Sequence, residues 1–294
     1  MSYYKPPKPD YDKYSTKQLL AIPIILLTIA ISILLLWTMV TGLPVDRGME
    51  FIGGSEVRIS VSDDVSDPRA EIESTFDSEI NSISSIPATG EYIVTFTQGT
   101  TTPEEIENQV SNNEKLTISE LSQISPSLGE DSQIIALQGL VISFILMSLF
   151  VLFHFKSIIP SFIVVFSAIS NITVSLAAMN LAGIPLTMGT VGALLMLIGY
   201  SVDSDILLNT YALKEKKIPF LESVHEAMRT GITMTVTSLS AMIVMATLAT
   251  LFGISLLADM GFVLAVGLST DLIITYLMNI AILRWYLKRK GDYI

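Results

Sequence analysis

The sequence predicts an α-helical membrane protein with six transmembrane helices and one α+β domain inserted between the first and the second helix. Half of the residues are hydrophobic, only 15% are charged and the mean hydropathy is +0.58, whereas soluble domains carry about 25% charged residues. Six apolar runs reach the length of about 20 residues that a bilayer core requires. A long acidic stretch separates the first run from the other five.

The apolar runs divide the chain into an arm at 1–18, a first helix at 19–40, a domain at 41–132, five helices within 133–286 and a tail at 287–294. We expect the first run to remain uncleaved, because it exceeds the roughly 7–15 apolar residues of a signal peptide and lacks a small-residue cleavage site. The six runs are Leu19 to Val40, Ile134 to Phe155, Ile158 to Ala178, Thr187 to Tyr211, Ile232 to Phe252 and Leu256 to Tyr286.

The distribution of lysine and arginine predicts the orientation in the cell membrane. Segment 41–132 holds four of the 17 basic residues and 18 of the 28 acidic ones, a net charge of −14. The other basic residues fall in alternate loops and at both ends, so we expect both termini in the cytoplasm and the domain outside it. The acidity keeps this domain soluble or binds a basic partner, and it argues against a nucleic-acid partner.

The domain between the first two helices has the predicted order β-α-β-β-α-β, the split, ferredoxin-like arrangement. A cap at Ser66 or Asp67 opens the first helix, and Thr102 followed by proline opens the second. A turn is expected at Pro87 to Gly90. The strands are expected at Ser55 to Val61, Asn81 to Ile86, Glu91 to Thr97 and Lys115 to Ile124, and the first helix at Asp67 to Glu79.

Several kinds of site are excluded by residue type. The chain has no cysteine, so it has no disulfide and no thiolate metal site. Its two histidines, His154 and His225, are far apart in the sequence and are expected to be solvated in cytoplasmic loops. The domain has no phosphate-binding loop and no nucleophile paired with histidine, so we expect no enzymatic activity, no cofactor and no metal. Gly53-Gly54 predicts a close backbone approach or a bulge.

Three carboxylates interrupt the apolar runs: Asp203 and Asp205 in the fourth and Asp271 in the sixth. A charge at the bilayer centre costs at least about 2.5–3.5 kcal/mol. Asp203 and Asp205 point about 200° apart on a helix and cannot share a face. Helical spacing predicts two polar stripes facing the bundle interior. They consist of Ser201, Asp205 and Asn209 and of Asp271, Thr275 and Asn279.

Two interpretations of these acids remain open. In the first, they form a proton-responsive relay, in which a nearby cation such as Arg229 restores the charged form. In the second, they hold the helices together through hydrogen bonds worth under about 2 kcal/mol each. Small residues in the third to fifth runs predict close helix packing; they include Gly189, Gly192, Gly199, Ser238, Ser240 and Ala241.

Four ordered motifs match a known family. They are GMEFIGGSEVRI from Gly48 to Ile59, SPSLG from Ser125 to Gly129, GYSVDSDILLNTYALKE from Gly199 to Glu215, and Met228-Arg229-Thr230. With them the chain resembles the SecF family, the smaller partner of SecD in the SecDF accessory complex of the protein-export translocon. The resemblance extends from about Tyr11 to Arg289 and makes Gly48, Gly53 and Gly54 signature residues.

The resemblance also suggests which residues couple to protons. Bacterial members typically carry Asn-Asp where this chain has Asp203-Ser204, so the family acid corresponds to Asp203 or Asp205. The Asp-x-Asp pattern together with Asp271 resembles the archaeal branch. The proton-coupling candidates are therefore Asp205, Asp203, Asp271 and Arg229.

The resemblance implies a helix bundle like half of an RND-type transporter, in an accessory subunit that assists a late stage of polypeptide translocation. Its implied partners are a SecD-type subunit, the Sec channel, translocating polypeptides and the lipid bilayer, and its implied energy source is the proton-motive force. One alternative is half of an RND-type exporter of lipids or small molecules. That alternative expects an aromatic-rich pocket, whereas 41–132 contains only Phe51, Phe76, Tyr92 and Phe96. Another is a passive scaffold around the translocon.

Overall fold

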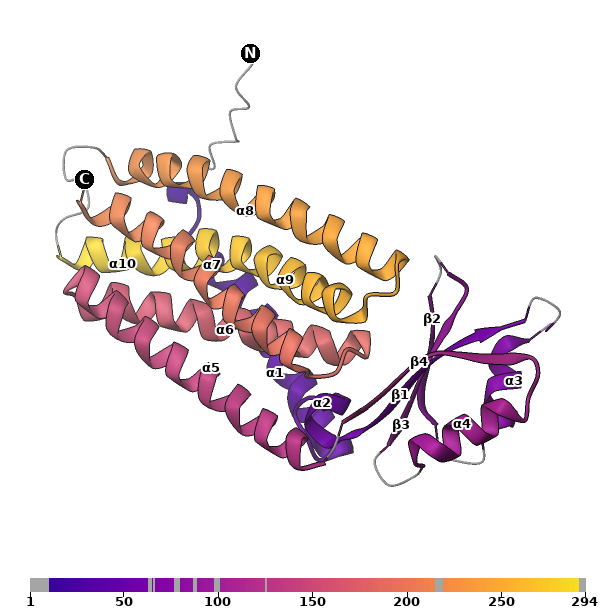
Figure 1. The fold of residues 1–294 in the computed structure, drawn as a ribbon. Helices are drawn as coiled ribbons and strands as arrows, with labels where there is room; N and C mark the ends of the chain where they lie inside the picture. Colours follow the sequence, from indigo (N-terminus) through magenta and orange to yellow (C-terminus); the bar gives the residue numbers. More distant parts are fainter. Residues whose placement is uncertain are drawn as a thin grey trace, which may run out of the picture.

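The computed structural model describes residues 11–62, 65, 67–76, 80–86, 89–97, 101–124, 126–214 and 219–290. Six long helices form a bundle with an α+β domain at one end (Figure 1). We call this the domain end, and we call the opposite end, where the first and last described segments of the chain lie, the terminal end. The long helices are α1 (Thr16–Thr41), α5 (Pro126–Phe155), α6 (Ile158–Ala182), α7 (Met188–Lys214), α8 (Phe220–Leu251) and α9 (Ser255–Ile273), which continues through a π-helical turn (Ile274–Asn279) into α10 (Ile280–Lys290).

All six are long and apolar enough to cross a membrane, as predicted. Helix α8 begins at Phe220 rather than Ile232, so His225 and Arg229 lie within it, and His154 lies in the last turn of α5. The loop positions predicted for the histidines are therefore wrong. For His225 the cause is that polar residues with good helix propensity extend α8 ahead of its apolar run. His154 falls within the apolar run Ile134 to Phe155 itself, which α5 follows to its end.

Helices α6, α7 and α9 form the centre of the bundle, and α1, α5 and α8 flank them (Figure 1). Helix α9 packs against α6, α7 and α8. Leu194 and Leu197 of α7 and Leu264 of α9 are fully buried in the apolar part of this core. The flanking helices expose large apolar side chains such as Leu36 and Phe150, which suits contact with lipid.

The α+β domain contains β1 (Gly54–Val61), α3 (Pro68–Thr75), β2 (Ile80–Ser85), β3 (Tyr92–Thr97), α4 (Pro103–Ser111) and β4 (Leu116–Ile124). Its four strands are antiparallel in the order β2-β3-β1-β4, which confirms the split arrangement. Asp67 caps α3, and Thr102 forms a capping box with Glu105 at the start of α4. The other proposed cap, Ser66, and Pro87 of the expected turn lie outside the described residues.

The core of this domain is apolar and separate from the bundle core. Val57 and Val94 of the sheet and Ile72 and Ile106 of the helices have no exposed surface. Phe76 and Phe96 meet edge to face, with ring centroids 4.9 Å apart. Most of the domain's few aromatic side chains therefore contribute to this core, which leaves few to line a pocket.

The domain meets the bundle in two places. One is a short helix that the sequence did not predict, α2 (Met49–Ile52), which lies between α1 and β1 beside the start of α5 (Figure 1). The other joins Ile86, in the β2–β3 connection, to the α8–α9 turn. A Cβ atom added to Gly253 in that turn would lie 2.4 Å from Ile86 Cγ2, so the two segments are in direct contact.

Candidate functional site

The interior of the bundle contains a cluster of polar side chains contributed by α6, α7, α9 and the π-helical turn. Both predicted stripes face inward, as the helical spacing requires. The exposed fraction is 0% for Asp205 and 1% for Asp271, so their polar partners must come from the protein. The other buried stripe members are Ser201, Asn209, Thr275 and Asn279.

Asp271 on α9 accepts hydrogen bonds from two neighbouring helices. Asn171 Nδ2 on α6 lies 2.8 Å from Asp271 Oδ1, and Ser204 Oγ on α7 lies 2.8 Å from Asp271 Oδ2. The same Asn171 amide is 2.8 Å from Ser201 Oγ. Asp271 therefore ties α6, α7 and α9 together at one level.

Asp205 on α7 is linked to Asp271 through a single hydroxyl. Thr275 Oγ1 lies 2.8 Å from Asp205 Oδ1 and 3.4 Å from Asp271 Oδ1. Asn279 Nδ2 donates a further hydrogen bond to Asp205 Oδ1. The second oxygen, Asp205 Oδ2, has no hydrogen-bond partner in the described chain, although the buried Ser167 hydroxyl of α6 lies beside the carboxyl group.

The π-helical turn explains how two of these partners reach Asp205. A regular helix has about 3.6 residues per turn, so over eight residues the side chains drift away from one line. The wider π turn reduces that drift, and it keeps Thr275 and Asn279 near the direction set by Asp271. Single π turns inside α-helices occur frequently at functional sites. Nothing in the residue pattern indicates this turn.

Neither carboxyl group is ion-paired to a cation among the described residues. Arg229 lies on α8 with an exposed side chain, whereas the hydrogen bonds of Asp271 and Asp205 come from buried side chains such as Ser204 and Thr275. Beside it, Gly231 accommodates the ring of Tyr276, because an added Cβ would lie 2.0 Å from the tyrosine hydroxyl oxygen. The structure therefore separates Arg229 from the acids with which the sequence grouped it.

Asp203 lies on the opposite face of α7 and is exposed. Gly199 and Met196 are exposed along the same line, one and two helical turns toward the domain end. An added Cβ at Gly192 or Gly199 would meet nothing within 4 Å. Of the small residues expected to pack closely, Gly189 does so against Leu256, whereas no described residue lies close to Gly192 or Gly199 on this outer face of α7.

The signature glycines belong to the base of the α+β domain. Gly48 N donates to Leu186 O at 2.7 Å in the α6–α7 connection, and Leu186 N donates to Asp46 O at 2.7 Å. An added Cβ at Gly48 would lie 2.6 Å from Thr187 Cγ2. Glu50 Oε2 accepts a hydrogen bond from Met188 N, 2.5 Å away, at the first residue of α7.

Gly53 and Gly54 turn the chain from α2 into β1. Both have positive φ, 77° and 150°, which is costly for residues with a side chain. A Cβ at Gly54 would lie 2.5 Å from Phe96 O on the neighbouring strand, and one at Gly129 would lie 2.9 Å from Phe51 O. These contacts confirm that the glycines permit a close backbone approach.

The acidic side chains of the domain differ in environment. Burial raises the pKa of Glu56 on β1; Arg58 lowers it, and Glu120 and Glu50 raise it further. In contrast, hydrogen bonds from Asn113 and Lys115 lower the pKa of Glu71. The surroundings of Glu56, at the base of the domain, therefore disfavour its ionised form.

Sequence reasoning missed several polar partners. Asn171 and Ser204 complete the contacts of Asp271, and Glu50 reaches the start of α7. A search for polar residues in apolar runs would have found Asn171, but not its partner. The described residues contain no group of three or more histidine, aspartate or glutamate residues placed to hold a metal ion.

Comparison with known proteins gives a consistent result. Residues 105–289 match the family model described as "Protein export membrane protein SecD/SecF, C-terminal". A protein-export membrane protein SecF of Haloferax volcanii is 46% identical over 280 residues, which cover 95% of this chain and 96% of that protein. The SecF protein of Haloquadratum walsbyi is 43% identical and covers 99% of both chains.

The fold also resembles solved structures. The crystal structure of SecDF, a translocon-associated membrane protein from Thermus thermophilus, matches 99% of this chain with a TM-score of 0.73 and 18% identity. The match covers 40% of that longer chain. A second SecDF structure, in the "super-membrane-facing form", has a TM-score of 0.65 at 18% identity. At this identity the likeness shows the shared fold.

Proposed function

The chain belongs to the SecF family of protein-export membrane proteins, and from this premise we propose that it is an accessory subunit of the Sec machinery that uses a proton gradient to assist polypeptide translocation. The observation that carries the proposal is the hydroxyl of Thr275, which bridges Asp205 and Asp271 at 2.8 and 3.4 Å. Two carboxyl groups this close, within the membrane-spanning bundle and without an ion-paired cation among the described residues, cannot both be charged at low cost.

A change in proton occupancy alters which hydrogen bonds the pair can make. A carboxylate only accepts, whereas a protonated carboxyl group also donates. Thr275 and Asn279 donate to Asp205, so loss or gain of its proton changes the contact between α7 and the π-helical turn. We assign the exchangeable proton to Asp205 Oδ2, which is buried beside the Ser167 hydroxyl.

The base of the α+β domain transmits such a change. Helix α7 carries Asp205, and its first residue is bonded to Glu50 of α2, which runs directly into β1. The backbone bonds between Gly48, Leu186 and Asp46 hold the adjoining connection. A shift of α7 along its axis therefore moves the sheet of the domain, where an emerging polypeptide would be handled.

The exposed outer face of α7 supports a SecD-type partner. An isolated aspartate facing lipid is expensive, and two glycines beside open space allow another helix to approach closely. Asp203, Gly199 and Gly192 share this face. We assign this outer face of α7 to contact with a helix of the SecD-type subunit. In this arrangement the partner covers Asp203, which acts at the interface between the two subunits.

The distribution of charge supports the orientation. Basic residues such as Lys288, Arg289 and Lys290 gather at the terminal end, and the domain at the other end is acidic. By the positive-inside rule the terminal end is cytoplasmic and the domain extracytoplasmic, in the cell membrane. On the extracytoplasmic side the domain can reach polypeptides that leave the Sec channel. No ATP is present on that side.

The test is polypeptide translocation by the chain reconstituted with its SecD-type partner and the Sec channel, with and without a proton gradient. Asp205→Asn and Asp271→Asn should retain complex formation but lose the gradient-dependent part of the late stage. Arg229→Ala tests whether the exposed arginine shares this role. Normal gradient dependence in all three variants, with loss on deletion of the chain, would instead identify a passive scaffold.

The exporter alternative has weaker support. The relatives that span nearly the whole chain carry the protein-export name, and the domain's phenylalanines serve its own core. Export of a lipid or small molecule by this chain without a SecD-type partner would restore that alternative.

A further inference from the structure

An apolar cavity lies at the domain end of the bundle, apart from the polar cluster. Its volume is about 230 Å³, and its walls come from the segment after α1 and from α2, α5, α6 and α7. Ala136 and Leu140 of α5, Ile172 and Leu176 of α6 and Leu194 of α7 are among the residues that line it. Engineered cavities of about 150 Å³ already bind small apolar molecules.

One cationic side chain lies in the wall of this apolar cavity. Arg47 Nη1 donates to Gln133 Oε1 at 3.4 Å, and Arg47 Nε is buried without a hydrogen-bond partner among the described residues. None of the described carboxylates is ion-paired with it. A guanidinium group has five donors in a plane that matches a phosphate group. The cavity therefore combines apolar walls with the Arg47 guanidinium group, part of whose hydrogen-bonding capacity is unused among the described residues.

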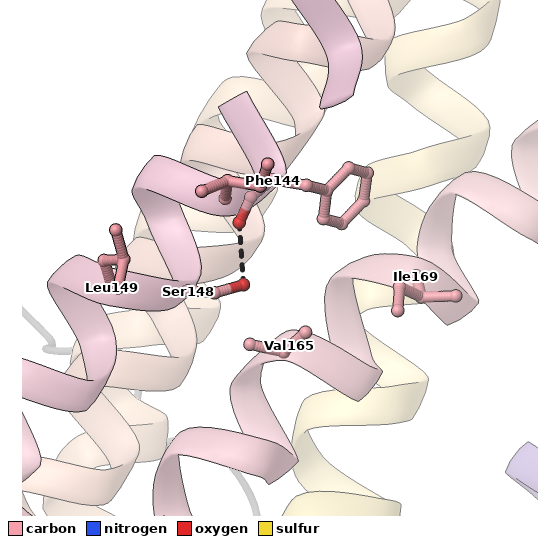
Figure 2. Close-up of a pocket in the computed structure, with 6 residues that line it drawn as sticks. Phe144, Ser148, Leu149, Val165 and Ile169 are labelled. Atoms are coloured by element: carbon pink, nitrogen blue, oxygen red, sulfur yellow. Dashed lines mark hydrogen bonds between the residues drawn. The ribbon is translucent and has the colours of Figure 1, made fainter. Parts of the chain in front are cut away.

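A second apolar space, a groove between α5 and α6, lies further along α5 from the cavity. Figure 2 shows Phe144 and Ser148 of α5 facing Val165 and Ile169 of α6 across this groove. Its volume is about 420 Å³, and Ser148 Oγ is occupied by a bond to Phe144 O at 2.8 Å. Phe144 follows the cavity residue Leu140 by one helical turn, so the two spaces lie in succession along α5.

The length of this path fits one lipid chain. From Gln133, beside Arg47, to Phe144 the helix rises about 17 Å at ~1.5 Å per residue. One leaflet contributes about half of a hydrocarbon core that is roughly 30 Å thick. Arg47 thus lies at headgroup level when the groove lies within the acyl region.

We propose that the cavity and the α5–α6 groove bind one hydrocarbon chain of an anionic glycerophospholipid, with its phosphate at Arg47. The apolar walls accommodate the chain, the lateral groove admits it from the membrane, and the guanidinium selects a negatively charged headgroup. This binding is independent of the proton-coupling pair and does not require a translocating polypeptide.

The first test is native mass spectrometry of the delipidated full chain with phosphatidylglycerol or phosphatidylcholine of identical acyl chains. The wild-type chain should retain one phosphatidylglycerol, and Arg47→Gln should reduce the preference over phosphatidylcholine about tenfold, because a charge-assisted contact is lost. Arg58→Gln, which removes another arginine of the same domain, is the matched control and should change nothing. Equal preference in wild type and Arg47→Gln would overturn the proposal.

The second variant tests the chain-binding path. Leu140→Trp fills the cavity and should lower retention of both lipids, whereas Leu146→Trp, on an exposed face of α5, should not. Unchanged retention in Leu140→Trp would contradict the assignment, as would displacement of the lipid by a SecD-type subunit, which would assign the groove to a partner helix.

A measurement on the unaltered chain avoids any effect of substitution on folding. Phosphatidylglycerol with a photoreactive group midway along one acyl chain should form adducts with α5 and α6 near Leu140, Phe144 and Ile169. An excess of unlabelled phosphatidylglycerol should reduce these adducts. Adducts spread evenly over α1, α5 and α8 would show ordinary lipid contact only and overturn the proposal.

Discussion

The two faces of α7 have contrasting surroundings. The inner face holds Ser201, Asp205 and Asn209, all fully buried. The outer face presents Gly199 and Asp203, both exposed among the residues that the structure describes. Each face carries an aspartate, so residue type does not distinguish the two acids, but among the described residues only the inner one, Asp205, has hydrogen-bond partners.

Under the proposed function, this contrast gives the two acids of the Asp-x-Asp motif different roles. Asp205 shares a hydroxyl with Asp271 and suits proton exchange inside the subunit. Asp203 needs a partner from outside and suits assembly. If the two faces of α7 differ in this way, substitutions on the inner face should impair gradient-dependent translocation, and those on the outer face should impair complex formation.

The largest effect is expected from Asp205→Asn. An amide keeps the shape but carries no exchangeable charge, so the gradient-dependent translocation rate should fall at least about tenfold, which corresponds to about 1.4 kcal/mol. Initial rates in proteoliposomes with an imposed gradient measure this. Asp203→Asn is the control for the outer face; if it reduces the rate equally in an intact complex, the distinction between the faces is wrong.

Gly199→Leu should prevent a partner helix from packing on the outer face of α7. The added side chain meets nothing in the chain itself, so folding should be unaffected, while close approach of a partner helix is blocked. We expect co-purification of the SecD-type subunit to fall about fivefold. Gly139→Leu, at a similarly open glycine on α5, is the matched control; equal losses in both variants would remove the outer face as the partner site.

Thr275→Val, on the side of the inner face, should lower the translocation rate by a smaller factor than Asp205→Asn. The variant keeps the shape and loses the hydroxyl that bonds both carboxyl groups. Interhelical hydrogen bonds in membranes average about 0.6 kcal/mol, which is a factor of about three in rate. Translocation in proteoliposomes measures it, with Thr247→Val on the exposed part of α8 as control. A wild-type rate would show that the pair functions without its bridge.

Glu50→Gln tests the link from α7 to the domain. The amide still accepts from Met188 N but loses the attraction of a carboxylate to a helix N-terminus, about 0.3–1 kcal/mol. Hydrogen exchange should become about two- to fivefold faster at the amides of α2 and Met188. Glu107→Gln on α4 should leave these rates unchanged, and unaltered exchange in Glu50→Gln would argue against this link.

Glu56→Gln should have the smallest effect, on the α+β domain alone. Because burial raises the pKa of Glu56 from its ordinary 4.5, its ionisation destabilises the folded domain as pH rises above that value. The variant should therefore be more stable than wild type at pH 7, by less than about 1 kcal/mol, and no more stable at pH 4. Hydrogen exchange of β1 at both pH values measures this; a gain of the same size at pH 4 would contradict the role of ionisation.

Much of the architecture could be predicted without the structure. The six apolar runs, the order of strands and helices in the domain and the inward direction of the Asp205 and Asp271 stripes all follow from local periodicity. The cap at Thr102 and the close approach at Gly54 were also predictable, because each depends on a few neighbouring residues. The helical position of His225 was not predictable, because an apolar run marks the membrane and not the end of a helix.

The sequence by itself determined that two carboxyl groups lie in the membrane and that Asp203 and Asp205 point apart, since helix geometry alone sets these directions. Only the tertiary structure decided that Asp205 meets Asp271 through Thr275, that a π turn aims Asn279, that Arg229 stays away and that Gly199 remains uncovered. The physical reason is the sequence distance that separates the interacting residues. Periodicity comes from bonds four residues apart, whereas these contacts depend on the depth and rotation at which whole helices pack.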